Sequence, residues 1–428
     1  MPATHTSFRA LILIWIGWAA IMLAFPIWSL SRLPPARPDN AMTWTGEATT
    51  ADPHAKEHGL AYVLGTHIGW DSEYYLSIDR HGYEDPGMRA VRPGSDPDLP
   101  DQALKSEEPT WFSLNHAFFP FYPWVMRAVG APLSLLGLAP QLTAILSGVA
   151  VSMLGTLAAM LALCDLARRR PAPDLDGALI GDGLRAGFYL LIWPASAFLA
   201  QVYTEGLFLG LSFGALAMMR RRRWAWAGLL GAAAVWTRST GLLLVIPFGL
   251  QWLADGGLGA LRRGPRGRAF LNGLLAAAPL AAYLAWRAVF GADFLYVESH
   301  YFGRDPLAIA RSWTAMREAW DILAGRDGPQ ASAYQMVEFA GILCGIGACL
   351  LLARRDPILA IYGLAVMFFC MTSGAALGAH RYVLSVPALF LVPAAWGRSA
   401  AFDRIWTLAG VMPMAVFTLA FSAGFWAG

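Results

Sequence analysis

Apolar runs of about bilayer length, separated by short polar connections, dominate the pattern of this chain. The first run covers residues 8–30 and is about as long as a membrane-spanning helix needs to be. Further runs follow at residues 141–167, 184–203, 204–219, 224–238, 239–255, 269–290, 334–353, 357–376, 380–396 and 404–427. They are too long and too numerous for the buried helices of a soluble protein. The pattern predicts an all-α polytopic membrane protein of about eleven crossings, in a single domain over residues 1–428.

Two long polar stretches and several arginine clusters set the expected topology. Residues 31–115 are rich in Pro, Asp, Glu and Gly, and residues 291–333 form a second long polar connection. The arginine clusters lie in short connections, at residues 168–170, 220–223, 262–268 and 354–355. Short connections that carry positive charge face the cytoplasm. The N-terminus is therefore expected in the cytoplasm, and both long polar stretches and the C-terminus are expected outside. A basic run can also bind nucleic acid or anionic lipid, but beside membrane spans we favour the topological interpretation and predict no nucleic-acid partner.

The segment from residue 224 to residue 255 is short for two crossings. It offers about 32 residues, where two full helices need about 40, and Arg238 falls at the join. Half-helices or a re-entrant pair fit this length better. Non-helical backbone at membrane depth is tolerated where it is buried in protein or lines a cavity, so the join is a predicted site. The two halves of the chain show no inverted repeat, which disfavours a transporter.

Composition adds information on the compartment. The chain is 57% hydrophobic and 14% charged, contains 18 Trp and has a net charge of +3. The four cysteines, Cys164, Cys344, Cys349 and Cys370, fall in predicted spans, so they imply no disulfide framework. The first apolar run has no small-residue cleavage site and is expected to stay as an anchor. The bias towards Ala, Arg and Gly, with no Asn-x-Ser/Thr acceptor, favours a bacterial inner membrane with its active site facing the periplasm or exterior.

The first polar stretch contains a candidate general base. Residues 67–78 predict a short amphipathic helix, with Trp70, Tyr74 and Ile78 on a stripe suited to the membrane headgroup level. Asp71 lies near its start, where an Asp can cap the helix or act as a base, and the two roles can coexist. Glu73 points to nearly the opposite face, so the two carboxylates do not form a glycosidase pair. Trp70 and Glu73 are also candidates for the substrate pocket.

Aromatic and acidic residues near two other outer turns are candidates for the substrate pocket. Residues 115–123 combine four aromatic rings with two prolines, which ends regular helix. Phe119 and Tyr122 of this segment either line the pocket or mark where the chain enters the membrane. Tyr203 and Glu205 lie at an outer turn, where Glu205 is either an ordinary loop carboxylate or a group that orients the partner of Asp71.

Four basic residues are predicted at the outer face, against the charge rule. They are Arg238, Arg304, His380 and Arg381. A cation there usually meets an anion, and the planar fork of arginine can hold two phosphate oxygens at once. Arg238, His380 and Arg381 are therefore the candidates for binding a donor phosphate, with Arg304 as a further pocket residue. The alternative is an arginine that snorkels to the interface.

A possible zinc motif lies in the first polar stretch. His54, Glu57 and His58 match the H-x-x-E-H pattern of inverted zinc proteases. The surrounding sequence is a Pro-, Asp- and Thr-rich loop without a domain that could supply a third ligand and a cleft. We therefore predict no metal site here.

Several of these segments together resemble a known family. They are Trp70-Asp71, Tyr75-Leu-Ser-Ile78, His81-Gly82-Tyr83, Ala117-Phe-Phe-Pro120-Phe-Tyr-Pro123, Tyr203-Thr-Glu205 and Arg238-Ser-Thr-Gly241, in this order. This set resembles the PIG-V mannosyltransferases and their bacterial relatives, which are integral-membrane glycosyltransferases of the GT-C class. The resemblance implies a GT-C-like fold, a polyprenyl- or dolichyl-phosphate-mannose donor, and inverting transfer on the outer or lumenal face. It also implies that an acidic residue of the first outer loop, here Asp71, is the base.

The chain departs from that pattern by a longer polar insertion between Tyr83 and Phe118, and the acceptor cannot be carried over. The resulting hypothesis is a polyprenyl-phosphate-sugar-dependent glycosyltransferase in which Asp71 deprotonates an acceptor hydroxyl. The leaving lipid phosphate is already a stable anion, so neither a cofactor nor a divalent metal is demanded. The alternatives are a lipid or lipid-linked-sugar transporter and a non-catalytic subunit of a glycosylation complex.

Overall fold

The computed structural model describes the chain in several continuous segments. They are residues 2–30, 32, 60–86, 88, 90–91, 112–168, 178–263, 266–374, 378–425 and 427. The H-x-x-E-H motif at residues 54–58 and most of the insertion between Tyr83 and Phe118 lie outside them.

The fold is almost entirely helical. The first part contains α1 (Pro2–Leu30), α3 (Leu60–Gly65), α4 (Asp71–His81), the antiparallel pair β1 (Ala90–Val91) and β2 (Phe112–Ser113), η1 (Leu114–Ala117), α5 (Phe121–Leu133), η2 (Ser134–Leu136), α6 (Pro140–Arg168), α7 (Ala178–Leu191), η3 (Pro194–Ala200) and α8 (Glu205–Arg220). The second part contains α9 (Trp224–Val235), η4 (Ser239–Leu244), α10 (Val245–Ala254), α11 (Gly257–Arg263), α12 (Arg266–Ala276), α13 (Ala278–His300), α14 (Ile309–Leu323), α15 (Pro329–Ala353), α16 (Pro357–Met371), α17 (Ala379–Tyr382), η5 (Val383–Ser385), α18 (Ala388–Trp396) and α19 (Ala400–Ser422).

Apolar helices of membrane-spanning length confirm an all-α polytopic membrane protein. Within the described residues, four helices are long and apolar enough to cross a bilayer, namely α1, α6, α15 and α19. The number rises to six if each of two bent pairs is counted as one span: α7 with η3 at 83°, and α12 with α13 at 50°. The number differs from the predicted eleven because several apolar runs fold as short helices, among them α9, α10 and α16.

The short crossing at residues 224–255 is broken at the predicted place. It consists of α9, η4 and α10, and Arg238 precedes η4 with an extended backbone, φ −155° and ψ 146°. The backbone amide of Phe121 donates to the carbonyl of Trp236, 3.0 Å away, so the break is attached to the start of α5. Irregular backbone at this depth is thus surrounded by protein, as membrane burial requires.

Small residues allow α6 and α8 to pack very closely. A Cβ on Gly206 would lie 2.1 Å from the carbonyl oxygen of Ser152, and one on Gly155 would lie 2.5 Å from the carbonyl carbon of Gly206. Gly210, four residues on, would meet the carbonyl of Gly155 at 2.6 Å. This small-xxx-small arrangement lets helix backbones touch inside a membrane. Because Gly206 follows Glu205 directly, the contact also fixes the start of α8.

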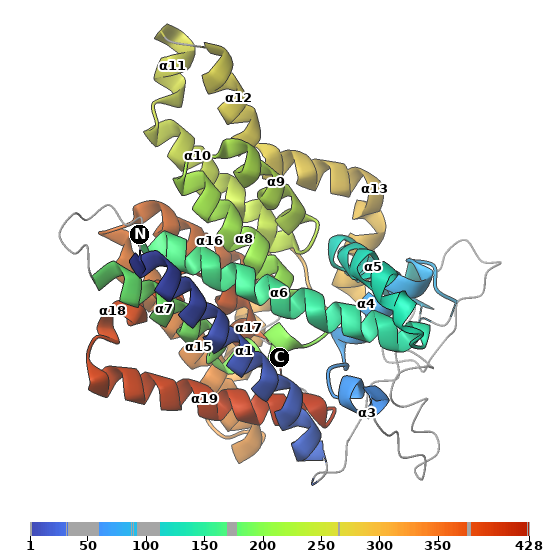
Figure 1. Cartoon of the computed structure of the whole chain (residues 1–428). Helices are drawn as coiled ribbons and strands as arrows, with labels where there is room; N and C mark the ends of the chain where they lie inside the picture. The colour runs from blue at the N-terminus through green and yellow to red at the C-terminus, as the bar shows by residue number, and fades with distance from the viewer. Residues whose placement is uncertain are drawn as a thin grey trace.

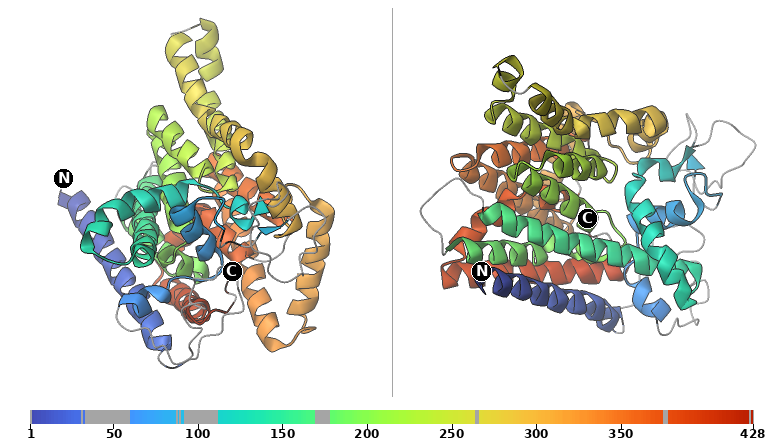
Figure 2. Two further views of the ribbon diagram at one scale, coloured as in Figure 1. Left: turned by 90° about the vertical axis from the view of Figure 1, so that its right-hand side faces the viewer. Right: turned by 45° about the horizontal axis from the view of Figure 1, so that its top comes forward.

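The helices within the first polar stretch, α3 and α4, gather with the following helix α5 at one end of the molecule. Figure 1 shows α3, α4 and α5 together at the right, while the N-terminus of α1 lies at the left. The second view of Figure 2 shows the same separation. The structure differs from the predicted membrane-surface role of α4, because Tyr74 and Ile78 are buried. Tyr74 stacks on Phe118 with ring centroids 4.4 Å apart, so the aromatic segment covers the stripe that was expected to face lipid headgroups.

Candidate active site

Asp71 is the first residue of α4 and does not cap it. The cap position belongs to Trp70, which has no side-chain capping bond and a φ of 55°. This left-handed conformation is strained for a bulky residue. The Asp71 carboxylate, 22% exposed, instead has its Oδ2 3.3 Å from Nη1 of Arg381. Of the two roles predicted for Asp71, the cap is therefore excluded by the geometry.

Hydrogen bonds to the turn before α8 hold this strained helix start. The amide of Asp71 donates to the hydroxyl of Tyr203 at 3.1 Å, and that hydroxyl donates to the carbonyl of Gly69 at 3.3 Å. His67 attaches the same turn from the other side, with Nδ1 2.9 Å from Oε1 of Gln201. Burial lowers the pKa of His67 to about 4, so its imidazole is neutral at physiological pH. The Nδ1–H can then donate to the glutamine oxygen.

The buried carboxylate of Glu205 joins two guanidinium groups, that of Arg381, which is buried, and that of Arg238, which is 15% exposed. Oε1 of Glu205 lies 2.6 Å from Nη1 of Arg238 and 3.1 Å from Nε of Arg381. Nη1 of Arg238 also donates to the hydroxyl of Thr204 at 3.0 Å. The network thus runs from Asp71 through Arg381 and Glu205 to Arg238. Of the two roles predicted for Glu205, this geometry favours the one in which it orients the partner of Asp71.

Three guanidinium groups surround the ring of Tyr382. The Cζ atoms of Arg238, Arg304 and Arg381 lie 5.2, 5.1 and 5.7 Å from its centroid. Each is within reach of the negative face of the ring. Arg304, from the second long polar stretch, therefore joins the predicted arginines. Against the two carboxylates of the network, Asp71 and Glu205, the three guanidinium groups leave an excess of one positive charge, which favours an anion.

Glu298 lies close to this cluster and is not among the predicted site residues. It occupies the last turns of α13, beyond the apolar part of the helix that ends at Gly291. Its carbonyl accepts from the amide of Arg304 at 2.9 Å. The pKa of its carboxyl is raised to about 7, chiefly by burial and further by Asp71, while Arg304 acts in the opposite direction. A single Glu at the end of a long helix carries no periodic signal, so only the folded chain reveals its position.

His380 does not join the arginines. It is fully buried, with Nδ1 3.0 Å from Oε1 of Glu338 and Nε2 3.1 Å from the carbonyl of Ala427. Glu338 also accepts from the amides of Gly378 and His380, at 2.7 and 2.8 Å. The predicted phosphate contact of His380 is therefore not supported by its position. Its neighbour Arg381 points to the other side of the four-residue helix α17, which Glu338 holds in place.

The remaining predicted pocket residues lie behind the cluster or beside it. Tyr122 is buried and donates to the carbonyl of Gly148 at 2.9 Å, so it belongs to the packing around α6. Phe119 stacks on Trp286 at 4.4 Å, in the contact between the aromatic segment and α13. Glu73 is buried on α4. The structure thus does not bring these three together with Asp71, and the arrangement favours a packing role for Phe119 and Tyr122.

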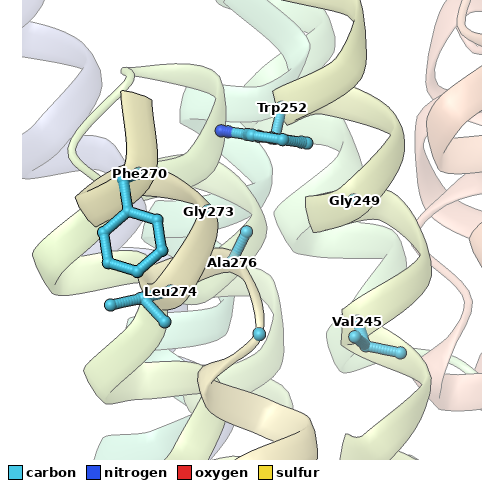
Figure 3. Close-up of a pocket in the computed structure, with 8 residues that line it drawn as sticks. Val245, Gly249, Trp252, Phe270, Gly273, Leu274 and Ala276 are labelled. Carbon is cyan, nitrogen blue, oxygen red and sulfur yellow. The ribbon is translucent and has the colours of Figure 1, made fainter. Parts of the chain in front are cut away.

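An apolar groove begins near the break that contains Arg238. Its volume is about 280 Å³, and it lies between α10 and the bend that joins α12 to α13 (Figure 3). The lining residues are Val245, Gly249, Trp252, Phe270, Gly273, Leu274, Ala276 and Ala277. The six residues of η4 separate Arg238 from Val245, which is about 12 Å at the rise of a 3₁₀-helix. A groove without charged lining suits a hydrocarbon chain.

Among the residues that the structure describes, no group of three or more His, Cys, Asp or Glu side chains is arranged to hold a metal ion. The charges near Asp71 are instead provided by arginines.

Part of the chain is similar to curated mannosyltransferases, although no protein-family model matches it. It is 32% identical over 189 residues to GPI alpha-1,6-mannosyltransferase 2 of Cricetulus griseus, a match that covers 43% of this chain and 31% of that protein. For the Homo sapiens enzyme, identity is 30% over 190 residues, with the same two coverages. The predicted family resemblance is confirmed. The PIG-V-like match spans about a third of the length of these relatives.

Two solved structures align with most of the chain at low identity. ArnT from Cupriavidus metallidurans, bound to undecaprenyl phosphate, aligns over 96% of this chain and 76% of its own, with a TM-score of 0.46 and 14% identity. The apo oligosaccharyltransferase of Archaeoglobus fulgidus aligns over 98% of this chain and 56% of its own, also with a TM-score of 0.46 and 14% identity. The roles of the site residues are therefore argued from this chain alone.

Proposed function

We propose that this protein is a membrane glycosyltransferase that transfers mannose from a polyprenyl-phosphate donor to a hydroxyl acceptor, with inversion. One observation carries the proposal: a carboxylate that solvent can reach, Asp71, is paired with a buried guanidinium that belongs to a cluster of three. A base and an anion site are thus adjacent. The similarity to mannosyltransferases supports the choice of sugar.

The donor is proposed to lie with its phosphate on the arginines and its hydrocarbon chain in the apolar groove. Arg238 and Arg381 are the cations closest to Asp71 in the network, and Arg304 shares the ring of Tyr382 with them. Arginine binds phosphate through two parallel hydrogen bonds. The groove begins about 12 Å from Arg238 by the rise of a 3₁₀-helix, close enough for one lipid molecule to occupy both.

The reaction needs one proton acceptor and one stabilised leaving group. Asp71 takes the proton of the acceptor hydroxyl while the hydroxyl oxygen bonds to the anomeric carbon from the side opposite the phosphate. The bond between that carbon and the phosphate oxygen breaks, and its electron pair leaves with the polyprenyl phosphate. The guanidinium groups stabilise the charge that grows on the leaving oxygen. Glu205 keeps both guanidiniums in place during this step.

Asp71→Asn tests the proposal. Asn keeps the shape of the side chain but has no useful proton affinity, so product formation should fall by at least about a hundredfold, the usual scale of acid–base assistance. Asp79→Asn makes the same chemical change on the same helix and should retain activity. The assay measures sugar transfer from polyprenyl-phosphate-mannose and, separately, movement of the donor across the bilayer. Near-normal transfer by a folded Asp71→Asn protein would remove Asp71 from the chemistry. Donor movement without transfer in the wild type would make the protein a transporter.

The orientation of the site is proposed to be outside the cell, with the N-terminus of α1 in the cytoplasm. The arginine clusters at the end of α6 and of α8 support it, because positive connections stay inside. A cysteine at exposed position Gln330 should react with an impermeant thiol reagent in intact cells, while one at exposed Arg223 should not. The opposite labelling pattern would reverse the model.

A further inference from the structure

A second pocket lies at the end of the molecule opposite the Asp71 cluster. Its volume is about 480 Å³, and it is formed where α15 and α18 end. The lining residues are Leu350, Leu351, Leu352, Arg354, Arg355, Val392, Ala395 and Trp396. α8 begins in the active-site cluster at Glu205 and ends at Arg220, which is paired with Asp356 next to the pocket. The 16 residues of α8 place the two sites about 24 Å apart along the helix.

The two arginines of this pocket carry charge that nothing nearby neutralises. Within the described part of the chain, neither Arg354 nor Arg355 has an ion-pair partner, and both are exposed. The adjacent acid, Asp356, is occupied by Arg220 and by the amide of Leu359 at 3.2 Å. Each of the two helix C-termini at the pocket contributes about half a negative charge. Two full positive charges therefore exceed the dipoles, and the pocket attracts anions.

The walls of the pocket are those of a lipid site. Leu350 and Leu351 are exposed on α15, a helix of membrane-spanning length, and Trp396 is half-exposed at its mouth. Tryptophan is enriched at the headgroup level of membranes, where one edge of its ring meets hydrocarbon and the other meets water. A freely soluble anion would leave these apolar walls uncovered. A diacyl phospholipid covers them with its chains while its phosphate reaches the arginines.

We propose that this pocket binds one anionic phospholipid, with the phosphate on Arg354 and Arg355 and an acyl chain along Leu350, Leu351 and Val392. Basic pockets between transmembrane helices recognise anionic headgroups in this way. The site is separate from the catalytic cluster, so the proposal holds independently of the proposed reaction.

The test uses the full-length protein, purified in mixed micelles that contain phosphatidylglycerol or phosphatidylcholine. Native mass spectrometry measures the bound lipid, and thermal unfolding measures the stabilisation that each lipid gives. The wild type should retain one phosphatidylglycerol and no stoichiometric phosphatidylcholine. Arg354→Gln/Arg355→Gln should weaken phosphatidylglycerol binding by about ten- to thirtyfold, the scale expected for two arginines near an anionic surface.

Two further variants separate a defined pocket from general electrostatic attraction. Arg223→Gln/Arg404→Gln removes the same number of charges from two exposed residues outside the pocket, and should change binding by about twofold or less. Ala395→Trp fills the pocket without changing its charge and should abolish retention of the lipid. Equal losses in both arginine pairs, full binding by Ala395→Trp, or equal retention of phosphatidylcholine by the wild type would overturn the proposal.

Discussion

The carboxylate that Arg238 and Arg381 share makes Glu205→Gln the most informative perturbation of the site. Its Oε1 lies 2.6 Å from the guanidinium of Arg238 and 3.1 Å from that of Arg381, and the side chains of Glu205 and Arg381 are buried while that of Arg238 is 15% exposed. Gln keeps the size of the side chain and leaves no cavity, so the effect is electrostatic. Removing one member of a buried ion pair costs about 3–5 kcal/mol because the remaining charge is uncompensated. Here two cations lose a partner, although Asp71 still faces Arg381.

The expected result is a less stable protein that an anionic ligand rescues. Glu205→Gln should lower the Tm by several degrees in scanning fluorimetry. A polyprenyl phosphate should raise the Tm more in the variant than in the wild type, because its phosphate replaces the missing negative charge. Glu318→Gln, an exposed glutamate on α14, provides the matched control and should change the Tm little.

A double-variant cycle makes the interpretation stricter. If the shared carboxylate acts through Arg238, the loss in Glu205→Gln/Arg238→Gln should be smaller than the sum of the two single losses, by about 1 kcal/mol or more. Additive losses, or a Glu205→Gln protein as stable as the wild type, would show that the network does not form as described.

Three other substitutions test the donor site, the unpredicted carboxyl and the helix contact. Arg238→Lys should raise the KM for the donor and lower kcat, because an ammonium cannot replace the planar guanidinium fork. The combined loss of transition-state stabilisation should be about 1–3 kcal/mol. Unchanged donor kinetics would place the donor phosphate elsewhere. The pKa of Glu298 is raised from 4.5 to about 7, chiefly by burial, so between these pH values the folded protein keeps a proton that the unfolded chain loses. The stability of the protein should therefore fall as pH rises from 4.5 to about 7. A pH series of Tm values should show a flatter curve for Glu298→Gln than for the wild type, and an unchanged slope would contradict this. Gly206→Ala should destabilise the protein by about 1–3 kcal/mol, because the new Cβ would lie 2.1 Å from the carbonyl oxygen of Ser152. The strain should displace Glu205 and so also reduce sugar transfer. Normal stability in thermal unfolding would contradict the close packing.

The sequence predicts most of the polar cluster because three of its members lie at the ends of apolar runs. Glu205, Arg238 and Arg381 each lie where a predicted span meets an outer connection, and charge at such a position is costly unless it has a partner. Asp71 lies instead in the first polar stretch, near the start of the predicted amphipathic helix. The structure brings all four together. Glu298 lies in a polar stretch, where one more carboxylate is unremarkable until the fold places it near Arg304.

Two differences come from tertiary packing that a linear pattern does not contain. His380 and Arg381 are adjacent in sequence, but a helical turn sends neighbouring side chains in different directions. The aromatic stripe of α4 suits a membrane surface and a protein interior equally well, and the segment that contains Phe118 decides between them. Among the described residues, fewer helices reach spanning length than the pattern predicts for a similar reason, since short helices such as α9 and α16 are stable only when neighbours cover their ends.

The position of Glu338 changes how sequence variants in the middle of α15 should be interpreted. A charged residue within an apolar helix invites the view that replacing it with a neutral one would only help insertion into the membrane. Here, however, its carboxylate holds the backbone of α17 through Gly378 and His380, and Arg381 depends on that short helix for its position. An allele that replaces Glu338 with leucine would therefore give a protein that is made and inserted in normal amounts but has lost the alignment of its site. Expression level alone would classify that allele as harmless.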